Sequence, residues 1–392
     1  MKRTAILLCT LLLFLCGCQV TFREVTQPEP TLAPTLPTEP APTQTVPTEP
    51  EPTETVSGFT SVEKLLAGMT TEEKVGQLFL VRCPKENDVQ DISKYHLGGF
   101  MLFGKDFQDR TAEQVQQVIA QYQEASLIPM LIAVDEEGGR VSRVSGYSQF
   151  RSTPFPSPRD LYAEGGLELI AETEVEKCHL LTSLGINVNF APVCDITTDP
   201  EAFMYPRSLG QDPEITGAFV AQTVQTMHAN GIAGTLKHFP GYGNNTDTHI
   251  GIAVDNRPIE EFENRDLLPF IAGIQAGCGA IMVSHTIVSC LDAEYPASLS
   301  PAVHNYMRNE MGYDGVIITD DLYMQAITDT YGLEEAAVLA VLAGNDILAC
   351  TDYRIQYGAV LEAVESGRIS MQQIDESVLR ILQWKYDSGL FS

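Results

Sequence analysis

Residues 316–321 read VIITDD, a short apolar run that ends in two carboxylates. Seven further apolar runs of similar length occur along the chain, separated by longer stretches with helical periodicity. They do not alternate apolar and polar residues, which is typical of strands buried on both faces of a parallel sheet. The eight expected strands are Gln77–Val81, Gly99–Phe103, Met130–Val134, Asn187–Phe190, Gly234–Leu236, Ala280–Val283, Val316–Ile318 and Asp346–Ala349.

The alternation of strands and helices predicts an α/β fold. Helices are expected at Ala112–Glu124, Glu168–Leu184, Thr216–Asn230 and Ser370–Lys385. Eight buried strands with helices between them favour a TIM (β/α)8-type barrel, built as a single domain over residues 61–392. An open doubly wound sheet is the alternative. It is disfavoured because no glycine-rich dinucleotide fingerprint follows the first strand.

The N-terminus has the features of an export signal. Two basic residues precede an apolar run, Ala5–Leu15, that is too short to span a bilayer comfortably. The run ends in CGC (16–18), which resembles a bacterial lipobox. We therefore expect residues 1–18 to be a lipoprotein signal peptide region with Cys18 lipidated, which anchors the protein outside the cell membrane. An ordinary secretory signal with incidental cysteines is the alternative.

Residues 19–60 are rich in proline, threonine and glutamate. Such a segment cannot bury a hydrophobic core, so it predicts a disordered, extended linker between the anchor and the domain. The whole chain carries 52 acidic and 24 basic residues, a formal net charge of −28. Because this charge repels phosphates, we expect neither nucleic acid nor a membrane surface as a partner, apart from the lipid anchor at Cys18. We expect a monomer.

The cysteines indicate no metal site. None of those that follow the signal region forms a CxxC pair, so a structural zinc site is not expected. Their disulfide pairing cannot be predicted from the sequence.

Ionisable side chains follow the third to seventh expected strands. They are Asp135, Asp195, Lys237, His238, His285 and Asp320. In a TIM barrel the loops at the carboxyl ends of the strands meet at one mouth, which carries the active site. Any one of these residues alone could be a hydrogen-bonded strand end, but five strands presenting them together indicate an active site. Asp195 is expected to hydrogen-bond within the mouth. For His285 a place in the pocket and a structural hydrogen bond are equally open.

These residue types suit a sugar substrate, because carboxylates and cations bind hydroxyl groups through charge-assisted hydrogen bonds. Cleavage of a glycosidic bond with retention needs a carboxylate below the anomeric carbon and a proton donor near the leaving oxygen. Asp320 fits the carboxylate, with its neighbour Asp321 as the competing candidate. The glycine-rich segment GYGNNTDTH (241–249) fits a mobile loop that carries the donor.

The motif Lys237-His238-Phe239-Pro240-Gly241, followed by Asp247-Thr248-His249, resembles the signature of glycoside hydrolase family 3. More narrowly, it is similar to that family's bacterial β-N-acetylhexosaminidases. The resemblance covers residues 61–392 and implies a TIM barrel with a retaining double-displacement mechanism. It implies Asp320 as nucleophile, His249 as general acid/base and Asp247 as the residue that orients His249. The sugar contacts that it implies are Asp135, Arg143, Arg207, Lys237 and His238.

Two features depart from the family pattern. Tyr242 stands where many members have histidine, and the loop before Asp247 is one residue shorter. Both lie in the mobile loop, so they leave the preference for the leaving group open.

The sequence thus predicts an exo-acting hydrolase, without metal or cofactor, that removes terminal β-linked N-acetylglucosamine from peptidoglycan- or chitin-type saccharides. A metal-dependent barrel hydrolase is one alternative, disfavoured because the first strand ends in Arg82-Cys83 without a ligand cluster. A catalytically silent sugar-binding lipoprotein is another. Within the family, β-glucosidase activity and β-N-acetylglucosaminide phosphorylase activity are two further alternatives. A histidine acid/base leaves room for an anionic acceptor, as a phosphorylase requires.

Overall fold

The computed structural model describes residues 62–197, 199–245 and 251–391. Outside the described residues lie the predicted lipidation site and the predicted acid/base dyad, which are Cys18, Asp247 and His249. The boundaries predicted for the signal region, the linker and the domain therefore stay predictions.

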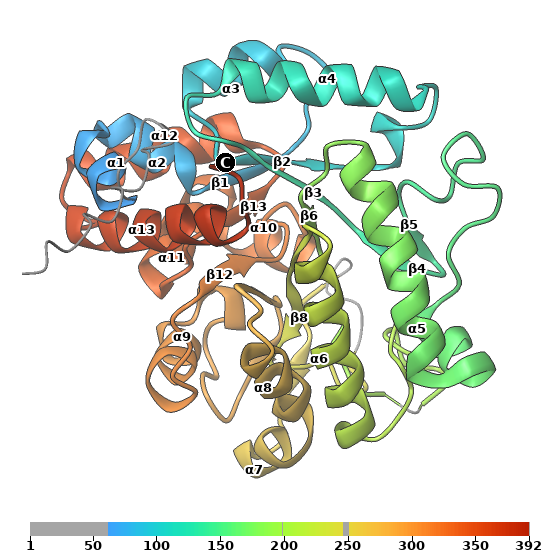
Figure 1. Ribbon diagram of the computed structural model, residues 1–392. Coiled ribbons are helices and arrows are strands. Elements are labelled where there is room, and N and C mark those ends of the chain that lie inside the picture. Colours follow the sequence, from blue (N-terminus) through green and yellow to red (C-terminus); the bar gives the residue numbers. More distant parts are fainter. Residues whose placement is uncertain (1–61, 198, 246–250, 392) are drawn as a thin grey trace, which may run out of the picture. The chain divides into compact units, whose positions relative to one another are not determined.

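Parallel strands form the centre of the domain (Figure 1). They are β1 (Phe79–Arg82), β2 (Gly99–Leu102), β3 (Leu131–Val134), β6 (Val188–Asn189), β7 (Ala233–Gly234), β8 (Leu236–Phe239), β10 (Ala280–Val283), β12 (Val316–Thr319) and β13 (Leu348–Cys350). Six of them pair in the order β13-β1-β2-β3-β6-β7, and three in the order β12-β10-β8. Two short pairs lie outside this arrangement: β4 (Glu136–Gly138) with β5 (Val141–Ser142), and β9 (Val254–Asp255) with β11 (Ile287–Val288).

The two groups of strands are linked at both ends. Only Thr235 separates β7 from β8. A parallel bridge between Ile318 and Ile347 connects β12 to the segment that enters β13. Neighbouring strands therefore follow the order of the chain, with the last strand beside the first, as in a TIM-type α/β domain.

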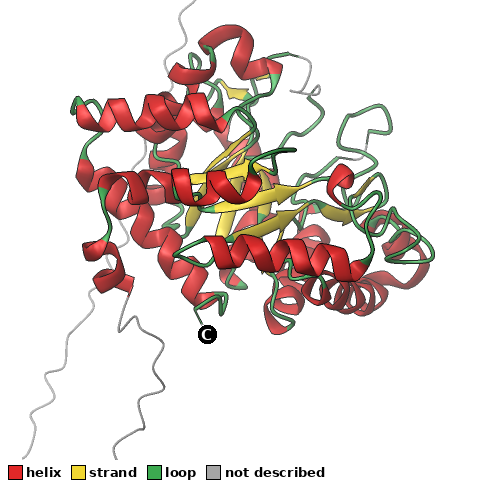
Figure 2. Cartoon of the chain, turned by 90° about the horizontal axis from the view of Figure 1, so that it is seen from above, coloured by secondary structure: helices red, strands yellow, loops and turns green. Residues whose placement is uncertain are grey.

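Helices surround the strands (Figure 2). They are α1 (Val62–Gly68), α2 (Thr71–Gln77), α3 (Asp88–Tyr95), α4 (Ala112–Ala125), α5 (Pro158–Ser183), α6 (Pro213–Ala229), α7 (Ile259–Glu261), α8 (Leu267–Gln275), α9 (Pro301–Asn305), α10 (Gln325–Tyr331), α11 (Leu333–Ala343), α12 (Tyr353–Glu365) and α13 (Met371–Asp387). None of the helices in the described ranges is both long and apolar enough to cross a membrane.

Each expected strand overlaps an observed strand, and the α/β prediction is confirmed. The first begins later than expected, at Phe79, because α2 extends to Gln77. The fifth is divided between β7 and β8. The span α5 is broken at Gly165 and Gly166, whose backbone angles are not helical, and the helix expected at Glu168–Leu184 corresponds to the part after this break. The part before the break begins at Pro158, where Ser157 accepts the hydrogen bond of the Asp160 N–H as an N-cap.

The hydrophobic core fills the space between the strands and the helices. One cluster joins β1, β2, β3 and β13 to α11, α12 and α13, and a second joins β8 and β10 to α6 and α8. A buried lysine interrupts this apolar packing. Lys385 of α13 donates hydrogen bonds to Gln77 Oε1 at 2.8 Å and to the Gly98 carbonyl at 3.0 Å. Burial lowers the pKa of Lys385 to about 7.

Candidate active site

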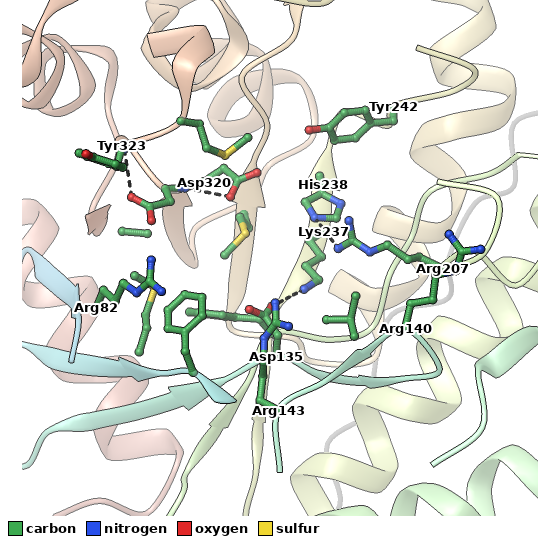
Figure 3. A pocket seen from close by; sticks show the side chains of 18 of the residues that line it. Arg82, Asp135, Arg140, Arg143, Arg207, Lys237, His238, Tyr242, Asp320 and Tyr323 are labelled. Carbon is green, nitrogen blue, oxygen red and sulfur yellow. Dashed lines mark hydrogen bonds and ion pairs between the residues drawn. The ribbon is translucent and has the colours of Figure 1, made fainter. Parts of the chain in front are cut away.

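A cavity of about 660 Å³ lies at the carboxyl ends of the central strands. This volume falls in the range of small-molecule sites. Asp320 and all five predicted sugar contacts line it (Figure 3). The other charged and aromatic side chains in its wall are Arg82, Phe103, Arg140, Phe190, Phe203, Tyr242, Asp321 and Tyr323. The residues that were predicted from separate strand ends are therefore together in one cavity.

A buried ionic network holds the two cations Lys237 and Arg207 in the cavity wall. Lys237 Nζ lies 2.7 Å from Asp135 Oδ1 and 2.6 Å from Glu137 Oε1. Arg207 donates two hydrogen bonds to Glu137, from Nε at 2.9 Å and from Nη2 at 2.7 Å. Glu137 thus connects both cations, and Asp135 presents a carboxylate next to Lys237. This pairing fixes hydroxyl-binding groups of both signs at defined positions.

The network fixes the charge state of Glu137. Burial opposes ionisation of this carboxyl, but the charges of Arg207 and Lys237 outweigh it and hold its pKa well below the usual range. For Arg207, burial is likewise outweighed by the charge of Glu137, which raises the pKa of the guanidinium. Both groups are charged throughout the neutral pH range.

His238 is oriented by a buried carboxylate. Its Nδ1 lies 2.8 Å from Asp195 Oδ2, and its Nε2 lies 3.2 Å from Arg207 Nη2. A guanidinium can only donate, so Nε2 accepts and Nδ1 carries the proton that is donated to Asp195. Asp195 also accepts the backbone N–H groups of His238 and Tyr242, at 3.1 and 2.7 Å. The expectation that Asp195 hydrogen-bonds within the mouth matches this geometry.

The two adjacent aspartates after β12 have different surroundings. Asp321 accepts hydrogen bonds on both oxygens, from the Tyr323 N–H at 3.0 Å and from Thr351 Oγ1 at 3.0 Å. Burial raises its pKa. Asp320 Oδ1 accepts the Asp321 N–H at 2.8 Å, and the Asp320 backbone N–H donates to the Val283 carbonyl at 3.0 Å. Backbone bonds thus fix Asp320 at the cavity, and hydrogen bonds on both oxygens hold the carboxylate of Asp321.

The hairpin β4–β5 carries Arg143 to the cavity. Glu136, fully buried, accepts the backbone N–H groups of Arg143 and Val144 at 2.8 and 2.7 Å, and also the Ser145 hydroxyl. The guanidinium of Arg143 lies 5.6 Å from the centre of the Phe103 ring. A single buried carboxylate therefore sets the position of this predicted sugar contact.

His285 does not line the cavity. Its Nδ1 lies 2.7 Å from Ser298 Oγ and its Nε2 lies 3.0 Å from the Asp321 carbonyl oxygen. Of the two roles left open for His285, this geometry favours the structural hydrogen bond, which here supports the loop that carries the two aspartates.

Sequence reasoning did not identify four residues that shape the site, namely Arg82, Glu136, Glu137 and Phe103. Within the run DEEGG (135–139), the sequence placed Asp135 at the cavity but indicated no role for the two glutamates that follow it. Tyr242, which departs from the family pattern, is buried and packs edge-on against His238, with ring centres 5.4 Å apart.

Comparisons with known proteins identify the family. The description "Glycosyl hydrolase family 3 N terminal domain" matches residues 70–384. A β-hexosaminidase of Xylella fastidiosa is 36% identical over 257 residues, which cover 64% of this chain and 75% of the relative. The β-hexosaminidase LpqI of Mycobacterium tuberculosis is 33% identical over 330 residues, which cover 80% of this chain and 82% of the relative.

A solved structure gives the same result for the fold. The glycoside hydrolase family 3 β-N-acetylglucosaminidase from Paenibacillus sp. str. FPU-7 aligns with a TM-score of 0.77 at 34% identity. The alignment covers 83% of this chain, which spans only 64% of that one. The predicted fold class and the prediction of a glycoside hydrolase are confirmed. The chain belongs to glycoside hydrolase family 3.

Proposed function

We propose that this glycoside hydrolase is a retaining exo-β-N-acetylhexosaminidase that removes terminal β-linked N-acetylglucosamine from peptidoglycan- or chitin-type saccharides. The observation that carries the proposal is the position of Asp320. Its carboxylate lies in the same cavity as the Lys237–Asp135 pair, His238 and Arg207, which suit the hydroxyl groups of one sugar ring. The relatives named β-hexosaminidase and β-N-acetylglucosaminidase support the choice of an N-acetyl sugar.

In the proposed mechanism Asp320 attacks the anomeric carbon while His249 protonates the leaving oxygen. The glycosidic C–O bond breaks, the alcohol leaves, and an ester forms between the sugar and Asp320. His249 then takes a proton from water, whose oxygen attacks the same carbon and releases Asp320 as a carboxylate. Asp247 orients His249. The roles of His249 and Asp247 rest on the sequence motif alone.

The residues around Asp320 would bind rather than react. Asp135 and Lys237 are paired at 2.7 Å and would contact neighbouring hydroxyls as acceptor and donor. Arg143 and Arg207 would donate to sugar oxygens. The fixed tautomer of His238 keeps its Nδ1 proton on Asp195. The energy for holding the sugar near Asp320 comes from these contacts, which need no reorganisation when the substrate enters.

We further propose that the enzyme is a monomeric bacterial lipoprotein, anchored outside the cell membrane through Cys18 and separated from it by the linker of residues 19–60. Metabolic labelling with a fatty acid tests the anchor: Cys18→Ser should lose the label and leave the membrane fraction. Label that persists in this variant would refute lipidation at Cys18. Light scattering of the chain from residue 61 onward tests the monomer.

The catalytic proposal is tested by release of nitrophenol from its β-N-acetylglucosaminide and its β-glucoside. We expect turnover of the N-acetyl substrate alone, unaffected by EDTA and lost in Asp320→Asn. With Asp320→Ala, azide should restore turnover and give the α-glycosyl azide, because azide occupies the face that the carboxylate has left. Turnover of neither substrate with sugar binding intact would refute the enzyme and favour the silent binder. Loss of activity with EDTA would favour the metal-dependent alternative.

A further inference from the structure

An arginine and an aspartate connect the two ends of the segment that carries the predicted acid/base motif. Residues 246–250, which include this motif, lie outside the described residues; Asn245 precedes them, and Asp255 follows in β9. Asn245 Nδ2 donates to Asp255 Oδ2 at 2.7 Å. Arg257 donates to both oxygens of Asp255, from Nε to Oδ1 at 3.0 Å and from Nη2 to Oδ2 at 2.8 Å. The residue before the segment is thus tied to the strand after it.

The same guanidinium ties both ends to the body of the domain. Arg257 Nη1 donates to Oδ2 of the buried Asp266 at 2.7 Å, immediately before α8. The guanidinium carbon also lies 4.3 Å from the centre of the Phe262 ring. Because Asp255 and Asp266 are both buried, these charge-assisted hydrogen bonds are stronger than they would be at the surface.

The backbone that leads into the segment packs directly on this network. Gly241 and Gly243 have positive φ values of 114° and 54°. A Cβ atom at Gly243 would lie 2.8 Å from Arg257 Nη2, and one at Gly241 would lie 2.9 Å from Asp266 Cβ. The path of the chain before the motif is therefore set by contact with these two side chains.

Backbone pairing holds the chain after the segment. The Ile287 N–H donates to the Ala253 carbonyl, and the Ser289 N–H donates to the Asp255 carbonyl, both at 2.9 Å. This pairing of β9 with β11 acts on one end of the segment, whereas the Asp255–Arg257–Asp266 network acts on both ends. Arg257 does not line the cavity. Its effect on a reaction there must pass through the chain that it holds.

We propose that Arg257 is a positioning residue for the acid/base: by holding Asn245 and Asp255 together against Asp266, it places His249 at the leaving oxygen. The proposal rests on the proposed glycosidase function and extends it to a residue outside the sequence motif. A leaving group that must receive a proton as the glycosidic bond breaks should then depend on Arg257. A leaving group that departs as a stable anion should not.

The test compares the β-N-acetylglucosaminides of phenol and of dinitrophenol, because phenol needs a proton as it leaves and dinitrophenol does not. Arg257→Met should lower kcat/KM about 100-fold for the phenyl glycoside and less than about threefold for the dinitrophenyl glycoside. Arg257→Lys keeps the charge without the planar fork and should lose about tenfold on the phenyl glycoside. The assays are run at about pH 8, where Asp266 is charged although burial raises its pKa to about 6.

Arg308 provides a matched control. It pairs with the buried Asp346 at 2.7 Å, and its side chain is 18% exposed, against 21% for Arg257, but it does not hold the segment. Arg308→Met should lower kcat/KM for both glycosides by the same factor. Loss of folded protein also affects both glycosides equally, so the ratio of the two values reports positioning alone. A ratio in Arg257→Met or Arg257→Lys that equals that of wild type would overturn the proposal.

A double variant tests whether Arg257 acts through His249. In the His249→Ala background the acid is already absent, so adding Arg257→Met should lower kcat/KM for the phenyl glycoside less than about threefold further. Losses that multiply in the double variant would show that Arg257 acts on another step, and the proposal would be wrong.

Failure of the glycosidase itself is recognised separately. If wild type cleaves neither glycoside, the proposed function is wrong and hydrogen exchange replaces the kinetics. The backbone amides of residues 241–245 and 253–255 should then exchange faster in Arg257→Met than in wild type and in Arg308→Met. Faster exchange confined to Arg257→Met supports the positioning of the two ends, and equal exchange in all three proteins refutes it.

Discussion

Replacing Glu137 by glutamine should uncouple two cations that the active site needs. Glu137 is 4% exposed and accepts three hydrogen bonds, two from Arg207 and one from Lys237. A glutamine side chain can accept on its oxygen only. Its NH2 group would face an N–H donor of one of the two cations. The substitution therefore removes a buried charge and also places two donors opposite each other.

The magnitude follows from what remains of the network. Removing one partner of a buried ion pair costs about 3–5 kcal/mol. Lys237 keeps Asp135 at 2.7 Å, and the side chain of Arg207 is 14% exposed and so is partly hydrated. Both facts favour the lower end, about 3 kcal/mol, which corresponds to a fall in Tm of roughly 4 °C for a domain of about 330 residues. The displaced cations should also lower kcat/KM about 100-fold.

The loss of stability caused by Glu137→Gln should become smaller as the pH falls into the acid range. The folded-state pKa of Glu137 is depressed, so its contribution is fully present above the ordinary pKa of glutamate and is lost as the pH falls toward the folded value. Wild type and Glu137→Gln should thus differ by a constant amount between about pH 5.5 and 8 and converge in strong acid. Calorimetric melting at several pH values measures this difference.

A matched control is available on the surface. Glu176 accepts two hydrogen bonds from Arg151, at 2.9 and 3.2 Å, but its side chain is 57% exposed. Because exposed pairs contribute about 0–1 kcal/mol, Glu176→Gln should melt within about 2 °C of wild type and keep its activity. A Glu137→Gln variant that behaves like this control would refute the claim that Glu137 positions Arg207 and Lys237.

Three further outcomes are expected. Asp195→Asn should lower kcat/KM about 100-fold, because an amide no longer selects the Nδ1–H tautomer of His238. Steady-state assays that show a decrease in kcat/KM of less than about fivefold would contradict this role. Asp320→Asn should lose about 10⁴-fold in kcat whereas Asp321→Asn should lose about tenfold or less; equal losses would reopen the choice of nucleophile. Burial lowers the pKa of Lys385 from 10.5 to about 7, so its stability contribution is complete above the unfolded value and is lost as the pH falls through about 7. Wild type should therefore gain stability relative to Lys385→Met between pH 7 and 10.5 in urea unfolding, and a constant difference would be inconsistent with a neutral buried amine.

The sequence predicted the strands and the cavity contacts more reliably than the supporting residues. Apolar runs such as Val316–Ile318 are strong local signals, and a TIM-type order brings their carboxyl ends together whatever the loops do. The first part of α5, from Pro158 to the break at Gly165 and Gly166, was missed because the signal from Ser157 and Pro158 was not used. Glu137 was missed for another reason. Its partners lie far along the chain, at Arg207 and Lys237, so no local pattern indicates that this acid is buried and paired.

The three consecutive acids Asp135, Glu136 and Glu137 show how one strand register determines the site. In a β-strand, residues two apart lie on the same face and adjacent residues lie on opposite faces. Asp135 and Glu137 both contact Lys237 Nζ, at 2.7 and 2.6 Å, whereas Glu136 turns away and accepts the N–H groups of Arg143 and Val144. Alternation along these three consecutive residues thus gives three chemically similar side chains different roles: Asp135 is a cavity acid, Glu136 supports the hairpin, and Glu137 pairs with two cations. A shift of this segment by one residue would place each acid on the opposite face of the strand and change its role. The turn at Gly138 and Gly139 closes the hairpin, with positive φ values of 95° and 62° that glycine adopts easily. The geometry of the cavity therefore depends on this turn.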